Sequence, residues 1–372
     1  MTMEAFIAYK FFGMLLVFFA VVGSTIVGKQ KNVDIETFGY NLGLPESEVK
    51  ALANIYEEAS TPSDVLRLAC QTAKLCLGQA QVNLSPLNQT LVDENWSETC
   101  FAEPYCIILP TNSSGVSAAI RIFGHLEVKF AIRSGGHSPV PSWSSIGNRG
   151  ILLDLQKLNS VTLSNDGTFA SVGPGARWGE VYETLGAETA LVVGTRIPDV
   201  GVGGSLLGGG YFYFSDQFGL AADNVKNFEV ALANGTIVEA NNSSNVDLFW
   251  ALKGGGPNFG IVTRYDLYTV PIYEIWGQLS VYSTGQAAEI LAAFDEWQEN
   301  GSSDDKGGVA LSIALDSVVV ALIYSEPQDS PPSAFSAFNS LQPIAIPVPA
   351  TNMPFVSILE ILGSSTPAIP GR

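Results

Sequence analysis

The stretch IRSGGHSPV, residues 132–140, places one of the two histidines of the chain directly after a Gly-Gly pair. Glycines have no Cβ, so a backbone that contains two of them in succession can approach a ligand closely. A histidine beside such a turn can react with that ligand or can merely cap the turn. The segments around this stretch carry the information that separates these two roles.

Strand and helix patterns alternate on both sides of the stretch. Val116, Ile120 and Phe123 recur at helical spacing, which predicts a helix that starts at Ser113, and residues 128–132 predict a strand that ends at the Gly-Gly pair. The dipeptide Asn234-Gly235 predicts the turn of a hairpin. Further strands are predicted at 151–155, 169–173 and 261–269, and further helices at 176–186 and 247–252.

Three glycine-rich segments lie where predicted strands begin or end: around Gly135, at 201–210 and at 254–260. Clustered backbone N–H groups in such loops form anion-binding concavities that can hold a pyrophosphate without a lysine. None of the three contains the G-x-G-x-x-G fingerprint of the Rossmann fold. Each cluster alone is compatible with a tight turn, whereas three together favour a dinucleotide site.

The composition excludes several classes of partner. The chain has 372 residues, 47% of them hydrophobic, and its 36 acidic residues against 18 basic ones give a net charge of −18. Such a charge repels phosphate backbones and anionic lipid, so nucleic acid is not expected as a partner. The hydrophobic content is sufficient for two or three buried cores.

The N-terminal part of the chain favours export. The uncharged, apolar span between Lys10 and Lys29 predicts a secretory signal peptide over residues 1–28, with an uncleaved membrane anchor as the alternative. The chain has four cysteines, at Cys70, Cys76, Cys100 and Cys106. Their even number predicts one or two disulfides, and their spacing is not that of a metal site. Glycosylation sequons begin at Asn83, Asn88, Asn95, Asn112, Asn234, Asn241, Asn242 and Asn300.

A second domain is predicted beyond Pro271, where the glycine clusters stop. Its pattern is a strand, a helix over 285–298 and an apolar strand pair over 309–325. The final SSTPAIPGR completes no helix or strand, which suggests that this domain is cut short.

The order of these segments resembles the FAD-binding module of the vanillyl-alcohol oxidase / p-cresol methylhydroxylase (PCMH-type) flavoproteins, and most closely the fungal berberine-bridge-enzyme-like oxidases. The resemblance runs from Pro110 to Thr269 and rests on VKFAIRSGGHS (128–138), ASVGPGARWGEVYETLG (170–186), DVGVGGSLLGGGYFYFS (199–215) and DLFWALKGGGPNFGIVTRYDLYT (247–269). It implies an α+β fold: a two-subdomain PCMH-type FAD-binding domain, followed by an incomplete substrate domain of antiparallel sheet and helices. The corresponding boundaries are 1–28 for the leader, 29–100 for an N-terminal arm, 101–270 for the FAD-binding domain and 271–372 for the partial substrate domain.

The resemblance also implies the residues of a cofactor site. The loop that wraps the FAD pyrophosphate comprises Arg133, Ser134, Gly135, Gly136, His137 and Ser138, and His137 is the point of covalent attachment to the benzenoid methyl group of the flavin. His125 lacks such a setting and is expected to be structural. The pyrophosphate and flavin are further lined by Val200, Gly201, Gly203, Gly204, Gly208 and Gly209, and the adenine side by Gly260, Ile261 and Val262.

Other positions refine this expectation. Ile197 stands where many relatives carry a cysteine as a second covalent link, so a single link through His137 is expected. Asp199 and Asp223 are expected to fix the loops through bonds from backbone N–H groups to their side chains, and Tyr211 and Tyr213 to pack as aromatic residues. No catalytic base and no metal ligand is assigned.

The implied function is that of a secreted, covalently flavinylated oxidase. It passes hydride from an alcohol group of a carbohydrate or secondary metabolite to FAD and on to dioxygen, with the small-molecule substrate and dioxygen as its partners. One alternative is a truncated, non-catalytic relative that binds flavin or nothing. A membrane-tethered surface protein is the other, if the leader stays uncleaved.

Overall fold

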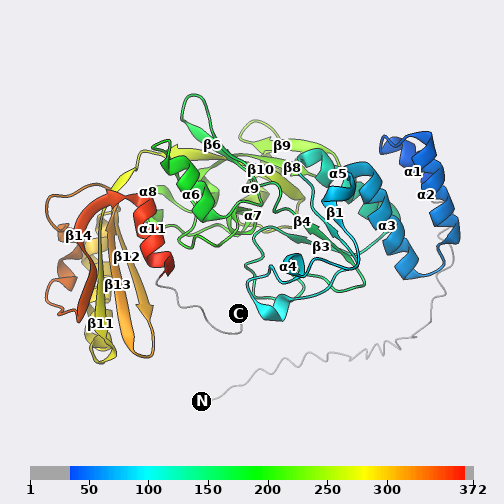
Figure 1. Cartoon of the computed structure of the whole chain (residues 1–372). Helices are drawn as coiled ribbons and strands as arrows, with labels where there is room; N and C mark the ends of the chain where they lie inside the picture. The colour runs from blue at the N-terminus through cyan, green and yellow to red at the C-terminus, as the bar shows by residue number, and fades with distance from the viewer. Residues whose placement is uncertain (1–33, 365–372) are drawn as a thin grey trace, which may run out of the picture.

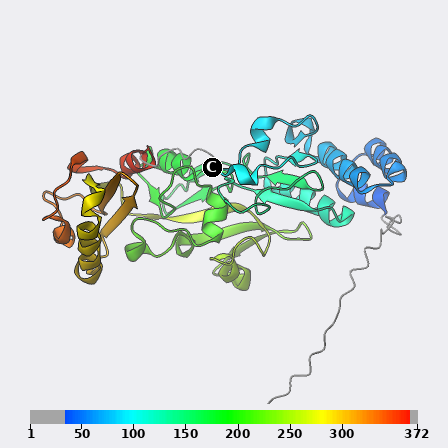
Figure 2. The ribbon, with the colours of Figure 1, turned by 90° about the horizontal axis from the view of Figure 1, so that it is seen from below.

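The computed structural model describes residues 34–364. The predicted leader and nearly all of the final SSTPAIPGR lie outside the described residues. Within 34–364, no helix is both long enough and apolar enough to cross a membrane. Figures 1 and 2 show an elongated molecule, with helices α1 (Ile35–Asn41) and α2 (Glu46–Glu58) at one end. The sheet that runs from β11 (Glu274–Ser283) to β14 (Ala345–Pro354) lies at the other end.

The N-terminal helices lead into a four-stranded sheet. Thr61 caps α3 (Pro62–Leu77) through a reciprocal bond pair with Asp64, which fixes where this helix begins. The sheet has the order β1-β2-β4-β3, with β2 and β3 both parallel to β4. The other elements of this region are α1 (Ile35–Asn41), α2 (Glu46–Glu58), β1 (Val82–Asn83), α4 (Gln89–Val92), β2 (Ile107–Ile108), α5 (Ser113–Leu126), β3 (Phe130–Arg133) and β4 (Ile151–Asp154).

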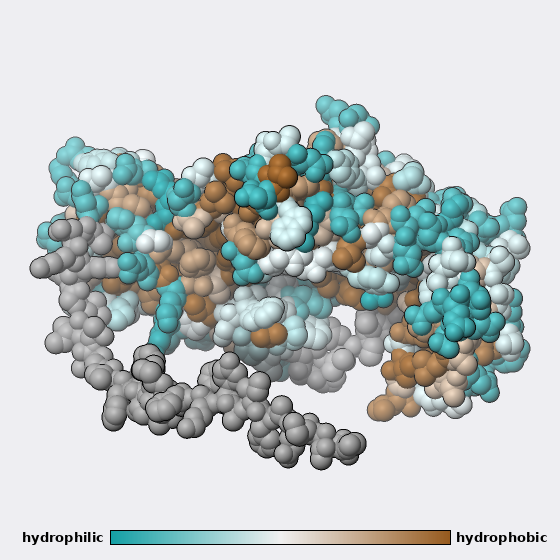
Figure 3. Space-filling model, turned by 180° about the vertical axis from the view of Figure 1, so that it is seen from behind, coloured by the Kyte–Doolittle hydropathy of each residue, from teal (hydrophilic) through white to brown (hydrophobic). Residues whose placement is uncertain are grey.

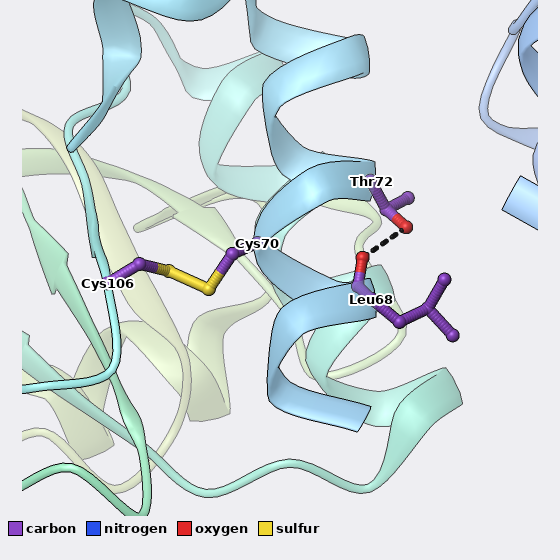
Figure 4. Close-up of a disulfide and its surroundings, with 4 residues drawn as sticks. All are labelled: Leu68, Cys70, Thr72 and Cys106. Atoms are coloured by element: carbon purple, nitrogen blue, oxygen red, sulfur yellow. Dashed lines mark hydrogen bonds between the residues drawn. A yellow bond between two sulfur atoms is a disulfide. The ribbon is translucent and has the colours of Figure 1, made fainter. Parts of the chain in front are cut away.

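A disulfide joins α3 to the segment that enters β2. Cys70 and Cys106 form this bond, and both are buried (Figure 4). Cys76 and Cys100 are free thiols. The sequence-based expectation of one or two disulfides is therefore met by one, which links the N-terminal arm to the first sheet.

The second sheet is antiparallel and has six strands. Its central strand β10 (Ile261–Val270) pairs with β6, β7 and β8, and the predicted hairpin at Asn234-Gly235 joins β8 to β9. Apolar side chains of β10 and of α6 (Trp178–Gly186) meet in the largest buried cluster. The remaining elements are β5 (Val161–Leu163), β6 (Phe169–Val172), β7 (Leu191–Val192), α7 (Val202–Leu207), α8 (Ser215–Phe218), β8 (Val225–Ala231), β9 (Ile237–Asn241) and α9 (Val246–Leu252).

The third sheet follows β10 after a short turn. It is antiparallel with the order β12-β13-β11-β14, and α10 (Ala287–Asn300) packs on it through Ile290 and Trp297. Its strands are β11 (Glu274–Ser283), β12 (Gly307–Ile313), β13 (Ser317–Tyr324) and β14 (Ala345–Pro354), and α11 (Phe355–Ser364) follows the last of them. Phe355 packs against Tyr182 of α6, so α11 ties this sheet to the second one.

Candidate cofactor site

Two of the three predicted glycine loops lie backbone to backbone. A Cβ added to Gly135 would lie 2.5 Å from the Cα of Gly201, and a Cβ added to Gly201 would lie 2.4 Å from the nitrogen of Gly135. Real Cβ atoms do not come this close to backbone, so only glycine is possible at both positions without moving the loops. The structure thus brings residues 133–138, which begin at the last residue of β3, against residues 199–204, which include the first turn of α7.

Arg177 clamps the two loops together. Its Nη1 donates to the carbonyl of Gly135 at 3.2 Å and to the carbonyl of Asp199 at 2.5 Å, and its Nη2 pairs with Glu94 at 2.8 Å. The same residue forms an isolated β-bridge with Gly201. Arg177 therefore fixes the distance between the loops and is committed to protein acceptors. Asp199 contributes its carbonyl to this clamp, in contrast to the side-chain role that we expected.

Arg133 is buried, with 1% of its surface exposed. Its Nη2 donates to Asp154 at 2.6 Å and to the carbonyl of Leu91 at 2.5 Å, and its Nη1 donates to Asn95 at 2.9 Å. The guanidinium thus holds the start of the loop in place, and its burial keeps it out of reach of a phosphate in the loop. Only the backbone of Arg133 can take part in the predicted pyrophosphate site.

His137 lies half-buried at the turn of the first loop. Its ring stacks on Trp96, with 5.0 Å between ring centroids and 23° between ring planes. The N–H of Trp96 donates to the carbonyl of Gly136 at 2.9 Å. Around His137, the Oγ of Ser134 donates to the carbonyl of Pro174, and the Oγ of Ser138 accepts from the N–H of Val140.

Helix α7 runs through the second glycine segment and is held by aromatic side chains. The hydroxyl of buried Tyr265 donates to the carbonyl of Gly203 at 3.0 Å, and burial raises the pKa of this phenol. The indole of Trp178 donates to Ser205 at 2.8 Å. Gly204 and Gly208 are exposed, and no atom lies within 4 Å of a Cβ built on Gly204, which leaves its face of the helix open.

The third glycine segment meets the end of α7. The N–H of Gly256 donates to the carbonyl of Leu207 at 2.9 Å. Gly260 adopts φ +141, and a Cβ there would lie 2.6 Å from Val230, so glycine is required. Ile261 and Val262 are buried in the cores, so they can offer only backbone groups to the predicted adenine side. The side-chain role expected for Asp223 is confirmed, because it accepts from the N–H of Leu220 at 2.9 Å.

A cleft of about 300 Å³ lies where the loop after α7 meets the third sheet. The Arg196 guanidinium covers the ring of Tyr211 at 4.9 Å from its centroid. Burial raises the pKa of Tyr213 to about 12, with a smaller opposing effect from Arg196. The Tyr213 hydroxyl is therefore a hydrogen-bond donor at neutral pH. The rest of the wall is formed by Asp216, Phe294, Trp297, Gln298, Ser302, Gly308 and Val309.

These groups fit a dinucleotide with a diphosphate. Loops 133–138 and 199–204 supply glycine backbone in close contact, which suits binding through N–H groups because both nearby guanidinium groups are engaged elsewhere. Among residues 34–364, no group of three or more His, Cys, Asp or Glu side chains could hold a metal ion. A diphosphate held between these loops would therefore be bound through backbone dipoles rather than through lysine or arginine side chains.

Comparison with known proteins identifies this module. A family model described as an FAD binding domain matches residues 104–241, which include both loops that Arg177 clamps. This part of the chain is an FAD-binding domain. An FAD-dependent monooxygenase of Arthrobotrys oligospora is 40% identical over 304 residues, which cover 81% of this chain and 59% of the relative. The chain spans about half the length of the curated relatives it matches.

Solved structures of two oxidases share the fold of this chain. A chitooligosaccharide oxidase superposes with a TM-score of 0.69 at 23% identity, over 82% of this chain and 64% of that one. A glucooligosaccharide oxidase from Acremonium strictum superposes with a TM-score of 0.66 at 21% identity, over 79% of this chain and 63% of that one. The FAD of that oxidase is linked through a cysteinyl and a histidyl group. These matches confirm the predicted fold class.

The side chains that hold the loops in place were not predicted from the sequence. Asn95 and Trp96 contact the loop of His137, and Glu94 pairs with Arg177, all from a segment that the sequence assigns to the N-terminal arm. Arg177 lies inside one of the quoted family segments, yet nothing in its spacing indicates a clamp. The one signal in the sequence is its position, directly after the turn that follows β6.

Proposed function

We propose that the protein is an FAD-dependent oxidase that binds its flavin covalently through His137. It takes hydride from an alcohol group of a carbohydrate or secondary metabolite and passes the electrons to dioxygen, which leaves as hydrogen peroxide. The observation that carries the proposal is the placement of His137, half-exposed on a glycine loop that lies backbone to backbone with a second glycine loop. Membership of an FAD-binding oxidoreductase family supports it.

The attachment is an oxidative substitution. One imidazole nitrogen of His137 would form a bond to the benzenoid methyl carbon, while one proton leaves that carbon and one leaves the other nitrogen of the imidazole ring. The electron pair passes to the isoalloxazine ring and from there to dioxygen, so that hydrogen peroxide accounts for both electrons and both protons. Such a link raises the redox potential of a flavin and prevents its loss. Ile197 offers no second link, so we expect attachment at His137 alone.

Acid precipitation tests the attachment. The yellow colour should remain with the precipitated polypeptide, because a carbon–nitrogen bond survives denaturation. His137→Ala should release its flavin into the supernatant and should still bind FAD before acid is added, since the loop N–H groups remain. His125→Ala is the matched control and should keep the flavin attached. Release of all flavin from the unmutated, flavin-loaded protein would overturn the covalent assignment.

The cleft at Arg196 supports a small-molecule substrate. It combines a cation, a phenol donor and the rings of Tyr211, Phe294 and Trp297, which suit a ligand with a flat face and polar substituents. Phe294→Ala, which removes a half-buried ring from the wall of the cleft, should weaken the binding of such a ligand without changing the flavin content. Relatives at about 40% identity are named monooxygenases, which favours oxygen insertion as a second candidate. The ratio of hydrogen peroxide formed to dioxygen consumed separates the two, since insertion leaves an oxygen atom in the product.

We also propose that the protein is exported. The sequons and the Cys70–Cys106 disulfide support passage through an oxidising, glycosylating compartment. Treatment with an endoglycosidase should increase gel mobility after expression in a eukaryotic host, and an unchanged mobility would count against export. Asn95 should remain unmodified in the folded protein, because its side chain is buried and bonded to Arg133 and Ser144.

A further inference from the structure

Trp96 is the aromatic residue that touches the predicted attachment residue. Its ring stacks on the ring of His137, and its backbone N–H is bonded to the carbonyl of Gly136. The contact therefore has two parts, one that fixes the register of the two segments and one that fixes the plane of the imidazole. Both rings are half-buried, so the stack leaves part of the imidazole accessible.

The segment that carries Trp96 is anchored on both sides of the stack. Before Trp96, Glu94 pairs with Arg177 at 2.8 Å, and buried Asn95 accepts from Arg133 and donates to Ser144. After Trp96, the thiol of Cys100 lies 3.4 Å from the carbonyl of Ser138. The segment that carries Trp96 is thus bonded to the loop of His137 and to Arg177 on both sides of Trp96, which fixes the position of the Trp96 ring.

A histidine on a glycine turn needs such a support. Gly136 adopts φ +63 directly before His137, and the neighbouring glycines offer no side chains that could restrict the imidazole. Bond formation requires one ring nitrogen to meet the methyl carbon along a defined direction. A stacked aromatic partner biases the ring toward one orientation by a factor of about 3 to 10.

We propose that Trp96 is a positioning residue for covalent flavin attachment. It holds the imidazole of His137 in the plane from which its nitrogen reaches the methyl carbon, without touching the reacting atoms itself. The inference rests on the attachment proposed above and adds to it the group that orients the nucleophile. Trp96 then governs how fast the bond forms, whereas the glycine loops govern whether FAD binds.

The test is the rate of covalent incorporation. Apo-protein from a riboflavin-limited host is mixed with FAD, and the flavin retained after acid precipitation is followed over time. Trp96→Ala should bind FAD as the unmutated protein does but should incorporate it about threefold to tenfold more slowly. Trp96→Phe, which keeps a ring, should restore most of the rate, whereas Trp96→Leu, which keeps apolar volume without a ring, should not.

Matched controls separate the possible failures. Trp250→Ala removes an exposed tryptophan of α9 and should leave the rate unchanged. If the unmutated protein incorporates flavin and Trp96→Leu does so at the same rate, the positioning role is wrong and the attachment stands. If the unmutated protein retains no flavin after acid, the attachment is wrong and the inference falls with it. Should Trp96→Ala not fold, the comparison of Trp96→Phe with Trp96→Leu decides alone.

Discussion

At the scale of single residues, the two arginines of the cofactor site show what the sequence does not reveal. The resemblance indicated where the glycines and His137 lie, because the conformation of a glycine loop is set mainly by residues that are adjacent in sequence. It did not reveal that Arg133 donates hydrogen bonds to Asp154 and Asn95. Nor did it reveal that Arg177 donates to Gly135 and Glu94, since all these partners are distant in sequence. Side-chain pairing of this kind is a property of the folded chain.

The Arg133–Asp154 pair should be costly to break from one side. Asp154→Ala leaves a buried guanidinium charge without its counter-ion, which should lower the free energy of unfolding by about 3–5 kcal/mol. The double replacement Arg133→Met with Asp154→Leu should cost clearly less than the sum of the two single changes. Urea unfolding of Asp154→Ala, of Arg133→Met and Asp154→Leu singly, and of the double variant measures these costs. If the loss of unfolding free energy in the double variant equals the sum of the two single losses, the two charges do not stabilise each other.

His125 should make stability depend on pH. Burial lowers the pKa of its imidazole, which stacks on Phe38 of α1, and nearby Asp34 offsets part of the shift. The unfolded chain then binds a proton more readily, so stability is full above the unfolded pKa of about 6.5 and falls as the pH drops below it. His125→Phe keeps a ring against Phe38 and should reduce this loss. Melting temperatures on both sides of pH 6.5 give the comparison, and an equal loss in both proteins would exclude His125 as the cause.

At the scale of elements, most helices and strands between 113 and 325 follow from hydrophobic periodicity. Helix α5 begins at Ser113 as predicted, and the hairpin turns at Asn234-Gly235. Helix α7 was not predicted, because its glycines disfavour a helix. The hydrogen bonds from Tyr265 and Trp178 and the burial of Leu206 provide the tertiary support that outweighs this preference.

The Cys70–Cys106 disulfide should stabilise the junction between α3 and β2. It spans a sequence separation of 36, for which chain entropy gives about 3–4 kcal/mol. Thiol titration of the unfolded, unreduced chain should find two free thiols, Cys76 and Cys100. In the native chain Cys76 should react slowly, because burial raises its pKa to about 11. Four free thiols before reduction would exclude the disulfide.

At the scale of the whole molecule, three sheets follow one another along the chain, and the sequence indicated the first two better than the last. Strand β14 was missed because Pro347 and Pro349 interrupt its pattern, and proline is tolerated mainly on edge strands. It lies at the edge of the third sheet, next to β11. Ile344, the residue directly before this strand, is 64% exposed. Figure 3 shows the face seen from behind, where apolar areas in brown alternate with hydrophilic residues in teal.

The engagement of both arginines has a consequence for how ionic strength acts on cofactor capture. Arg133 is the only lysine or arginine in 133–138 and 199–204, and its guanidinium is enclosed by protein acceptors. An FAD molecule with two negative charges thus approaches a chain of net charge −18 without a free lysine or arginine in these loops to attract it. Added salt screens this repulsion, so the association rate of FAD with the His137→Ala apo-protein should rise with salt concentration. Stopped-flow quenching of flavin fluorescence measures the rate, and a fall with salt would reveal a cation that attracts the diphosphate.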